Sequence, residues 1–162
     1  MKMNKLMAIS LGIGIPCFVW PLVAGLINPQ VTWMGFVGCT AFYASGAGKA
    51  GAIKGLCGAM TGMLWAMLVI SFGGLGFMAS GGFIATILGA LATGFIAFTM
   101  TYQSKLPFLA IIPATFMGCF STFASGGNWK LMMISIPMGV VLGICCQLCG
   151  DYLYKTFGDG KE

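Results

Sequence analysis

Apolar segments separated by short polar breaks run along the whole chain. The apolar segments cover about residues 6–27, 31–45, 50–72, 77–102, 106–125 and 131–154. Polar residues and glycines collect in the breaks, for example in residues 28–30 and 103–105. Because a helix that crosses a bilayer needs roughly 20 mostly apolar residues, this pattern predicts six transmembrane helices. The second segment is short for a complete crossing.

The composition agrees with burial in a membrane. Of the 162 residues, 59% are hydrophobic and 7% are charged, whereas a typical soluble domain is about 25% charged. We therefore expect an all-α membrane protein in which residues 1–162 form a single transmembrane domain. Lys2 and Lys5 followed by apolar residues resemble a signal peptide, but no clear small-residue cleavage site follows. The segment is therefore interpreted as a retained first helix.

The lysines predict the orientation. If the N-terminus lies in the cytoplasm, seven of the eight lysines fall on the cytoplasmic side and only Lys130 falls outside. Lysine and arginine are enriched in the cytoplasmic loops of membrane proteins. The sequence thus predicts a multi-pass protein with both termini in the cytoplasm.

A sequence repeat divides the chain into two halves. Residues 38–46 (GCTAFYASG) match residues 118–126 (GCFSTFASG) at an offset of 80 without a gap. The match predicts two three-helix repeats, over about residues 6–73 and 77–154. Because three is an odd number, the second repeat enters the membrane upside down. Inverted repeats of this kind are found in many transporters.

Two segments resemble a known bacterial family. Residues 33–42 (WMGFVGCTAF) are similar to a signature of the YcdZ-like inner-membrane proteins, and so are residues 115–119 (TFMGC), 122–124 (TFA) and 129–131 (WKL). The resemblance implies a location in the bacterial inner (cytoplasmic) membrane. It implies no particular activity.

The sequence offers little material for catalysis. It contains no histidine, which is the commonest general acid or base, and the predicted spans hold no pair of carboxylates. Cys146-x-x-Cys149 has the spacing of a metal or redox site, but helix packing is the favoured interpretation. We expect no enzyme activity, no metal and no cofactor. The lysines form no basic patch interleaved with aromatic residues, so nucleic-acid binding is not expected.

The repeat indicates where a solute would pass. In inverted repeats the solute site lies at the repeat interface, beside short or interrupted helices. Gly46, Pro113 and Gly126 are the expected breaks in the second and fifth helices. The candidate lining residues carry hydroxyl, thiol or aromatic side chains on these two helices: Cys39, Thr40, Tyr43, Ser45, Cys119, Ser121, Thr122, Phe123 and Ser125. Ordinary helix packing is the alternative for each of them.

Lys49 and Lys130 would lie at the two mouths of such a path. If they contact the solute, they favour a small anion such as a carboxylate. The alternative is that both side chains extend to the aqueous interface while their stems stay in the apolar layer.

Two functions from different classes fit these observations. The first is a channel or facilitator for a small polar or weakly charged solute such as urea, ammonium or formate. Facilitated diffusion is favoured over proton coupling, because proton-coupled transporters usually place acids or histidines inside the membrane. Sodium coupling through exposed backbone carbonyls is a further alternative. The second is a non-transporting scaffold or small subunit of a membrane complex. Stripes of small residues such as Gly51, Gly55, Gly58 and Gly62 allow close helix packing, and we expect a homo-oligomer in the lipid bilayer.

Overall fold

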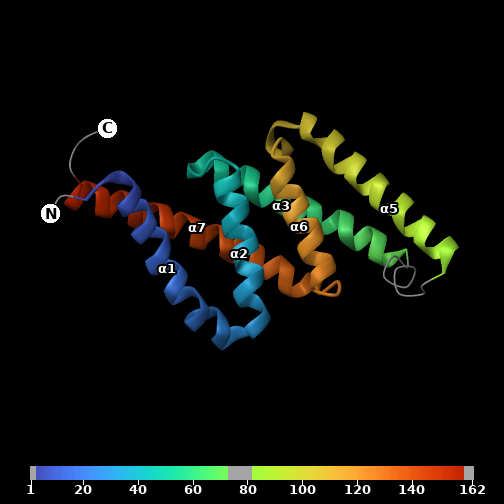
Figure 1. Ribbon diagram of the computed structural model, residues 1–162, viewed down its shortest axis with the longest axis horizontal. Helices are drawn as coiled ribbons and strands as arrows, with labels where there is room; N and C mark the ends of the chain where they lie inside the picture. Colours follow the sequence, from blue (N-terminus) through green and yellow to red (C-terminus); the bar gives the residue numbers. More distant parts are fainter. Residues whose placement is uncertain (1–2, 73–81, 159–162) are drawn as a thin grey trace.

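A computed structural model describes residues 3–72 and 82–158 of the chain, and this part of the chain is all-α (Figure 1). The α-helices in chain order are α1 (Lys5–Ile27), α2 (Pro29–Ala44), α3 (Gly48–Ser71), α5 (Phe83–Tyr102), α6 (Ile112–Ala124) and α7 (Trp129–Phe157). Two short 3₁₀ helices, Gln103–Lys105 and Pro107–Leu109, connect α5 to α6.

Asparagine side chains mark the start of three helices. The side chain of Asn4 accepts a hydrogen bond from the N–H of Met7 at 2.8 Å, and Asn28 accepts one from Gln30 at 2.9 Å. Asn128 accepts the N–H of Leu131 at 3.4 Å. The first N–H groups of a helix have no partner inside the helix, so these caps stabilise the ends of α1, α2 and α7.

Helix length distinguishes four long helices from two short ones. α1, α3, α5 with its 3₁₀ extension, and α7 are long and apolar enough to cross a membrane. α2 has 16 residues and α6 has 13. At a rise of 1.5 Å per residue they reach about 24 and 20 Å, less than the roughly 30 Å of a hydrocarbon core. Residues 3–72 and 82–158 are thus all-α, with four helices that are long and apolar enough to cross a membrane.

The predicted fifth helix is wrong in its extent. The sequence predicted a helix over residues 106–125 with Pro113 near its middle, whereas α6 starts at Ile112 and Pro113 lies in its first turn. Proline lacks an N–H group and fits the first turn of a helix better than its interior. Pro107 starts a separate 3₁₀ helix for the same reason. Residues 77–81 of the predicted fourth helix lie outside the described residues.

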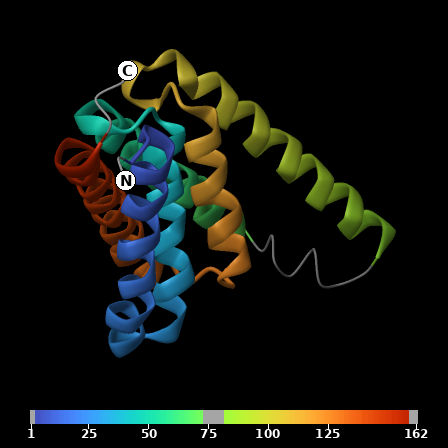
Figure 2. The same ribbon diagram turned by 60° about the vertical axis from the view of Figure 1, so that its left-hand side comes forward.

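Two helix crossings hold the two halves together. α2 crosses α7, and α6 crosses α3 (Figures 1 and 2). A Cβ atom added to Gly38 of α2 would overlap the carbonyl oxygen of Ile136 in α7, and one added to Gly118 of α6 would overlap the carbonyl oxygen of Ala59 in α3. Small residues allow such close backbone approach in membranes. The glycine stripes therefore pack helices within this one chain.

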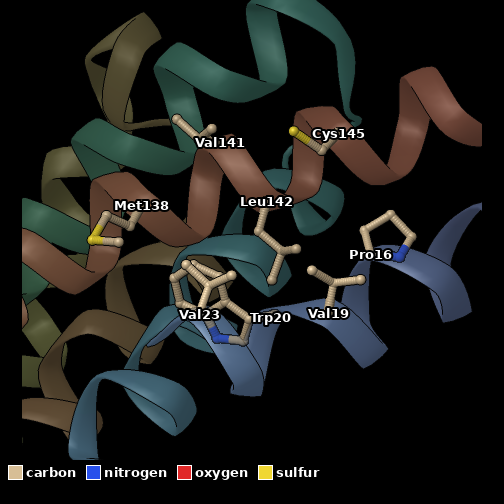
Figure 3. A pocket seen from close by; sticks show the side chains of 8 residues that line it. All are labelled: Pro16, Val19, Trp20, Val23, Met138, Val141, Leu142 and Cys145. Atoms are coloured by element: carbon tan, nitrogen blue, oxygen red, sulfur yellow. The ribbon is translucent and has the colours of Figure 1, made fainter. Parts of the chain in front are cut away.

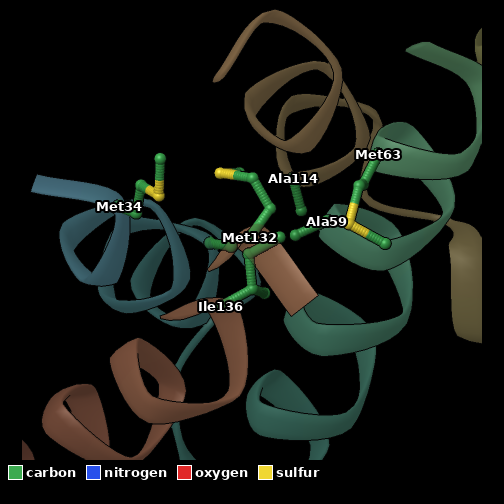
Figure 4. Close-up of a cluster of buried hydrophobic side chains, with 7 residues drawn as sticks. Met34, Ala59, Met63, Ala114, Met132 and Ile136 are labelled. Atoms are coloured by element: carbon green, nitrogen blue, oxygen red, sulfur yellow. The ribbon is translucent and has the colours of Figure 1, made fainter. Parts of the chain in front are cut away.

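An apolar cluster lies between the two crossings (Figure 4). Its buried members come from α2, α3, α6 and α7: Met34, Ala41, Ala59, Met63, Ala114, Met132 and Ile136. All of them are at most 2% exposed. These apolar side chains fill the space between α2 and α6. We call this group the central cluster.

The two outer helices, α1 and α5, are packed differently. α1 follows α7 so closely that a Cβ atom at Gly12 would overlap the backbone of Gly150. α5 stands at the edge of the molecule (Figure 2) and reaches α3 mainly through Ile96 and Met100. A polar link reinforces this contact, because the Trp65 indole N–H donates to the Gln103 side-chain oxygen at 2.8 Å.

The two ends of the described chain lie side by side. The N–H of Met3 donates to the carbonyl oxygen of Phe157 at 2.8 Å. The α2–α3 turn and the start of α6 lie on this same side of the molecule (Figures 1 and 2). The α1–α2 and α6–α7 turns lie on the opposite side.

Candidate functional site

α2 and α6 end in the same backbone motif. After α2, the N–H of Ala47 bonds the carbonyl of Phe42 at 3.1 Å, and the N–H of Gly46 bonds that of Tyr43 at 3.0 Å. After α6, Gly127 bonds Thr122 and Gly126 bonds Phe123, both at 2.9 Å. These are the two bonds of a Schellman motif, which requires a residue with positive φ after the helix.

The residues that supply this conformation are the two predicted breaks. Gly46 has φ +90° and Gly126 has φ +67°. Residues 41–50 and 121–130 also show the same order of buried, half-buried and exposed positions. The sequence match at an offset of 80 is thus accompanied by equal turn geometry and equal exposure.

The predicted lining residues of α2 face two directions. Cys39 is buried beside Leu142 and Cys146, on the side of α2 that meets α1 and α7. Tyr43 is half-buried on the same side. Thr40 is exposed, and its hydroxyl donates to its own helix. The buried hydroxyl oxygen of Ser45 has no hydrogen-bond partner among the described residues.

The predicted lining residues of α6 lie elsewhere. Cys119 is buried and Phe123 half-buried where α6 meets α3 and α5. Thr122 is fully buried and donates to the carbonyl of Gly118, within its own helix. Ser125 donates to the carbonyl of Thr122 at 2.8 Å and accepts the N–H of Asn128 at 3.2 Å. The last member, Ser121, is also fully buried, and within residues 3–72 and 82–158 its hydroxyl oxygen has no partner.

The structure does not bring the two sets together around one space. Cys39 and Tyr43 face α1 and α7, whereas Cys119 and Phe123 face α3 and α5. The central cluster lies between α2 and α6. The mouth residues Lys49 and Lys130 are exposed, and the Lys130 ammonium lies 5.9 Å from the centre of the Trp129 ring.

A polar hollow is present where α1, α2 and α7 meet, on the side of the chain ends. It has a volume of about 200 Å³, and we call it the polar pocket. Its lining residues are Ile9, Tyr43, Ala47, Cys146, Gln147, Gly150 and Asp151. It combines a phenol, an amide and a carboxylate, and Tyr43 is its one member from the predicted lining set.

Gln147 connects the polar pocket to the α2–α3 turn. Its side-chain oxygen accepts the N–H of Gly48 at 2.9 Å. Ala47 and Gly48 have φ +56° and +62°, so this hydrogen bond stabilises an unusual backbone. Sequence reasoning missed Gln147. A signal was available, because Gln147 and Asp151 are four residues apart and therefore share one face of an otherwise apolar helix.

Cys146, which lines the polar pocket, belongs to a cluster with two further thiols. Cys146 lies beside Cys39, and Cys17 packs against the same cluster. The Cys146 thiol is 3.9 Å from the carbonyl oxygen of Ile13. All three cysteines are free, and the described residues contain no group of three potential ligands that could hold a metal ion. The three thiols are weakly polar groups that extend from the Tyr43 side of the pocket into the contact between α1, α2 and α7.

The matching position in the second half is apolar. At the turn after α6, a Cβ atom at Gly127 would lie 3.2 Å from the terminal methyl of Ile70. At the offset of 81 that relates α3 to α7, Ile70 corresponds to Asp151, and Ala66 corresponds to Gln147. The polar residues of the pocket are thus present at the turn after α2 and have no polar counterparts at the matching turn after α6.

Other hollows are apolar and open toward the outside of the helix assembly. A groove of about 340 Å³ runs between α1 and α7 (Figure 3). Its lining residues are Pro16, Val19, Trp20, Val23, Met138, Val141, Leu142 and Cys145. A second groove, between α5 and α6, includes Cys119 and Phe123. Such surfaces suit lipid chains or other helices.

Comparison with known proteins identifies the family. Residues 10–151 match the family described as "Protein of unknown function (DUF1097)". The chain is 35% identical to "Inner membrane protein YcdZ" of Escherichia coli (strain K12) over 155 residues, which cover 93% of this chain and 89% of the relative. It is 33% identical to "Inner membrane protein YcdZ" of Salmonella typhimurium, over 93% of this chain and 91% of the relative.

A further relative is "Uncharacterized protein YahC" of Escherichia coli (strain K12), at 31% identity over 95% of this chain and 96% of the relative. No solved structure matches the chain. The resemblance to YcdZ-like proteins that residues 33–42 predicted is confirmed. The chain is a membrane protein and belongs to the DUF1097 family, whose function is unknown.

Proposed function

We propose that this protein is a facilitator for a small polar or weakly charged solute in the bacterial inner membrane. Its helices would cross the membrane as two inverted three-helix repeats. The observation that carries the proposal is the pair of matched helix ends, where α2 and α6 close with equal Schellman motifs at Gly46 and Gly126. Paired short helices at equivalent points of two halves are typical of solute sites in inverted-repeat transporters.

The position of the chain ends supports this topology. Because Met3 bonds Phe157, both ends lie on one side of the molecule, which requires an even number of crossings. Among the described connections, the α1–α2 and α6–α7 turns lie on one side and the α2–α3 turn and the start of α6 lie on the other, which supports this topology (Figures 1 and 2). The distribution of lysines favours a cytoplasmic location for the side of the chain ends.

The polar pocket would serve as the cytoplasmic entrance. It opens on the side of the chain ends, and the thiols of Cys146 and Cys39 continue from it toward the middle of α2. Beyond these thiols, the central cluster fills the interface between the two repeats. Passage therefore requires Met34 and Met132 to move aside, and methionine is the apolar side chain best suited to such rearrangement.

Flux into proteoliposomes tests the proposal. Stopped-flow swelling would compare urea, glycerol, methylammonium and formate, with empty liposomes as the reference. All three glycines are exposed with no atom near their Cβ positions. Gly46→Leu and Gly126→Leu should slow flux more than Gly14→Leu, because Gly46 and Gly126 have positive φ at the matched helix ends and Gly14 lies within α1. Expression and oligomeric state of each variant are checked first. Equal swelling with and without the protein across the panel would rule out a facilitator for these solutes.

The second candidate function is a non-transporting membrane subunit. It is favoured by the buried, apolar central cluster and by the apolar grooves beside α1 and α5. This alternative predicts no flux for any solute and a second protein that co-purifies from the native membrane. The proteoliposome assay therefore separates the two candidates.

A further inference from the structure

We propose that the polar pocket binds a primary ammonium group. Small amines would then be the class of solute that enters the protein from the side of the chain ends, and this assignment of a transported solute rests on the proposed function. The binding of the ammonium group does not, because it follows from the residues of the pocket.

The first argument is charge. Asp151 is the one acidic residue of the described part of the chain, since Asp159 and Glu162 lie outside it. It lines the pocket, and within residues 3–72 and 82–158 its carboxylate forms no ion pair. Lys155 lies one turn further along α7 and is exposed, so its ammonium group is free to stay in water. Asp151 is exposed at the edge of an apolar helix interface, and a carboxylate without an ion pair among the described residues favours a cation over an anion.

The second argument is hydrogen-bonding capacity. A primary ammonium group has three N–H donors and no acceptor. Asp151, Tyr43 and Gln147 line the pocket, and their side chains carry a carboxylate, a hydroxyl and an amide oxygen, which can all accept hydrogen bonds. The Gln147 oxygen already accepts the N–H of Gly48, and its second lone pair is available. Hydrogen bonds between charged partners are stronger than those between neutral groups.

The third argument is the number of ligands and the size of the pocket. Calcium needs six to eight oxygen ligands, often from several carboxylates, and this pocket has one carboxylate. A hollow of about 200 Å³ accepts a molecule of a few heavy atoms. Methylammonium and protonated ethanolamine are small enough for the pocket, and each carries one positive charge with three N–H donors. Tetramethylammonium carries the same charge but has no N–H donor.

Two sources could supply the ammonium group. One is a free amine in solution, and the other is the headgroup of an ethanolamine phospholipid, because the pocket lies at the end of α7 near the expected membrane surface. Both present the same R–NH₃⁺ group to Asp151. The experiment therefore contains an arm for each.

Calorimetry on the purified full-length protein tests the proposal. In nanodiscs without ethanolamine lipids, methylammonium should bind at least about ten-fold more tightly than tetramethylammonium, because one hydrogen bond to a charged group accounts for that factor. Asp151→Asn should weaken methylammonium binding by about ten-fold or more, while Asp159→Asn, with the same change in net charge, should not. Tyr43→Phe provides an independent variant with a smaller expected loss.

The lipid arm repeats the titration in nanodiscs that contain ethanolamine phospholipid. A lower apparent affinity for methylammonium there identifies the headgroup as a competitor for the same pocket. Equal affinity in both discs assigns the site to free amines. Either result supports ammonium recognition, whereas equal binding of methylammonium and tetramethylammonium, or binding unchanged by Asp151→Asn, overturns it.

Flux measured on the same preparations separates this inference from the proposed function. Binding without methylammonium flux would support the ammonium site and count against a facilitator. Flux that persists in Asp151→Asn, with no measurable binding to the wild-type protein, would overturn the ammonium site and leave the facilitator standing.

Discussion

The backbone contact between α2 and α7 leads to a quantitative prediction about Gly38. A Cβ atom at this position would overlap the Ile136 carbonyl oxygen and lie 2.9 Å from the Val140 nitrogen. Both are backbone atoms of α7, so no side-chain rotation can relieve the overlap. In Gly38→Ala the two helices must separate, and the central cluster beside them loses contacts.

The expected magnitude combines two opposing effects. Overpacking typically costs about 1–3 kcal/mol, and the backbone contact places Gly38→Ala at the upper end of that range. Replacing glycine by alanine inside a helix contributes about 1 kcal/mol in the other direction. Gly14→Ala receives only this favourable effect, since no atom lies within 4 Å of its Cβ position. The two variants should thus differ by about 3 kcal/mol.

The assay is thermal unfolding of both variants in the same detergent, followed by tryptophan fluorescence. For a chain of this length, about 3 kcal/mol corresponds to a Tm difference on the order of 10 °C. Gly118→Ala, at the crossing of α6 and α3, should resemble Gly38→Ala. If Gly38→Ala unfolds at the same temperature as Gly14→Ala, α2 and α7 do not approach as described, and the argument fails.

Three further predictions concern the turns and the topology. Gly46→Ala and Gly126→Ala should each lower the free energy of unfolding by about 1–2 kcal/mol, because both positions have positive φ; equal unfolding temperatures for wild type and variants would contradict this. Gln147→Leu should lower the free energy of unfolding by about 1 kcal/mol, because the N–H of Gly48 in the α2–α3 turn loses its acceptor; a matched Gln147→Glu variant, which keeps an acceptor, should be less affected in the same melt. In a Cys-less background, a membrane-impermeant maleimide added to intact cells should label Lys130→Cys and not Ser104→Cys. The reverse pattern would invert the topology, and labelling of both from outside would exclude six crossings.

The helix ends show how far local sequence determined the fold. Asn28 follows the first apolar segment and Asn128 precedes the last one, and an asparagine side chain can cap the start of a helix. Gly46 and Gly126 end α2 and α6 because glycine adopts positive φ without a steric penalty. These signals act over a few residues, so the breaks at residues 28–30, Gly46 and Gly126 were predicted without any knowledge of packing. The capping hydrogen bonds of the asparagines were not predicted. The beginning of α6 was missed because proline was interpreted as a break inside a helix and not as its start.

The candidate site depended on contacts that no local pattern contains. The repeat predicted that Cys39 and Cys119 occupy equivalent positions, and their burial agrees. It did not indicate that α2 packs against α7 and α6 against α3, which turns the two thiols away from each other. Gln147 and Asp151 gained their place in the polar pocket only because α7 lies against both α1 and the α2–α3 turn.

The sequence by itself determined that this is an all-α membrane protein of the DUF1097 family, with matched turns at Gly46 and Gly126, because hydrophobic length, glycine and asparagine act locally. The tertiary structure decided which faces meet. Helices in a membrane associate through the fit of small residues, and a stripe of glycines does not specify its partner. Only the folded chain shows that the centre is filled by Met34 and Met132 and that the polar groups gather beside it at one end.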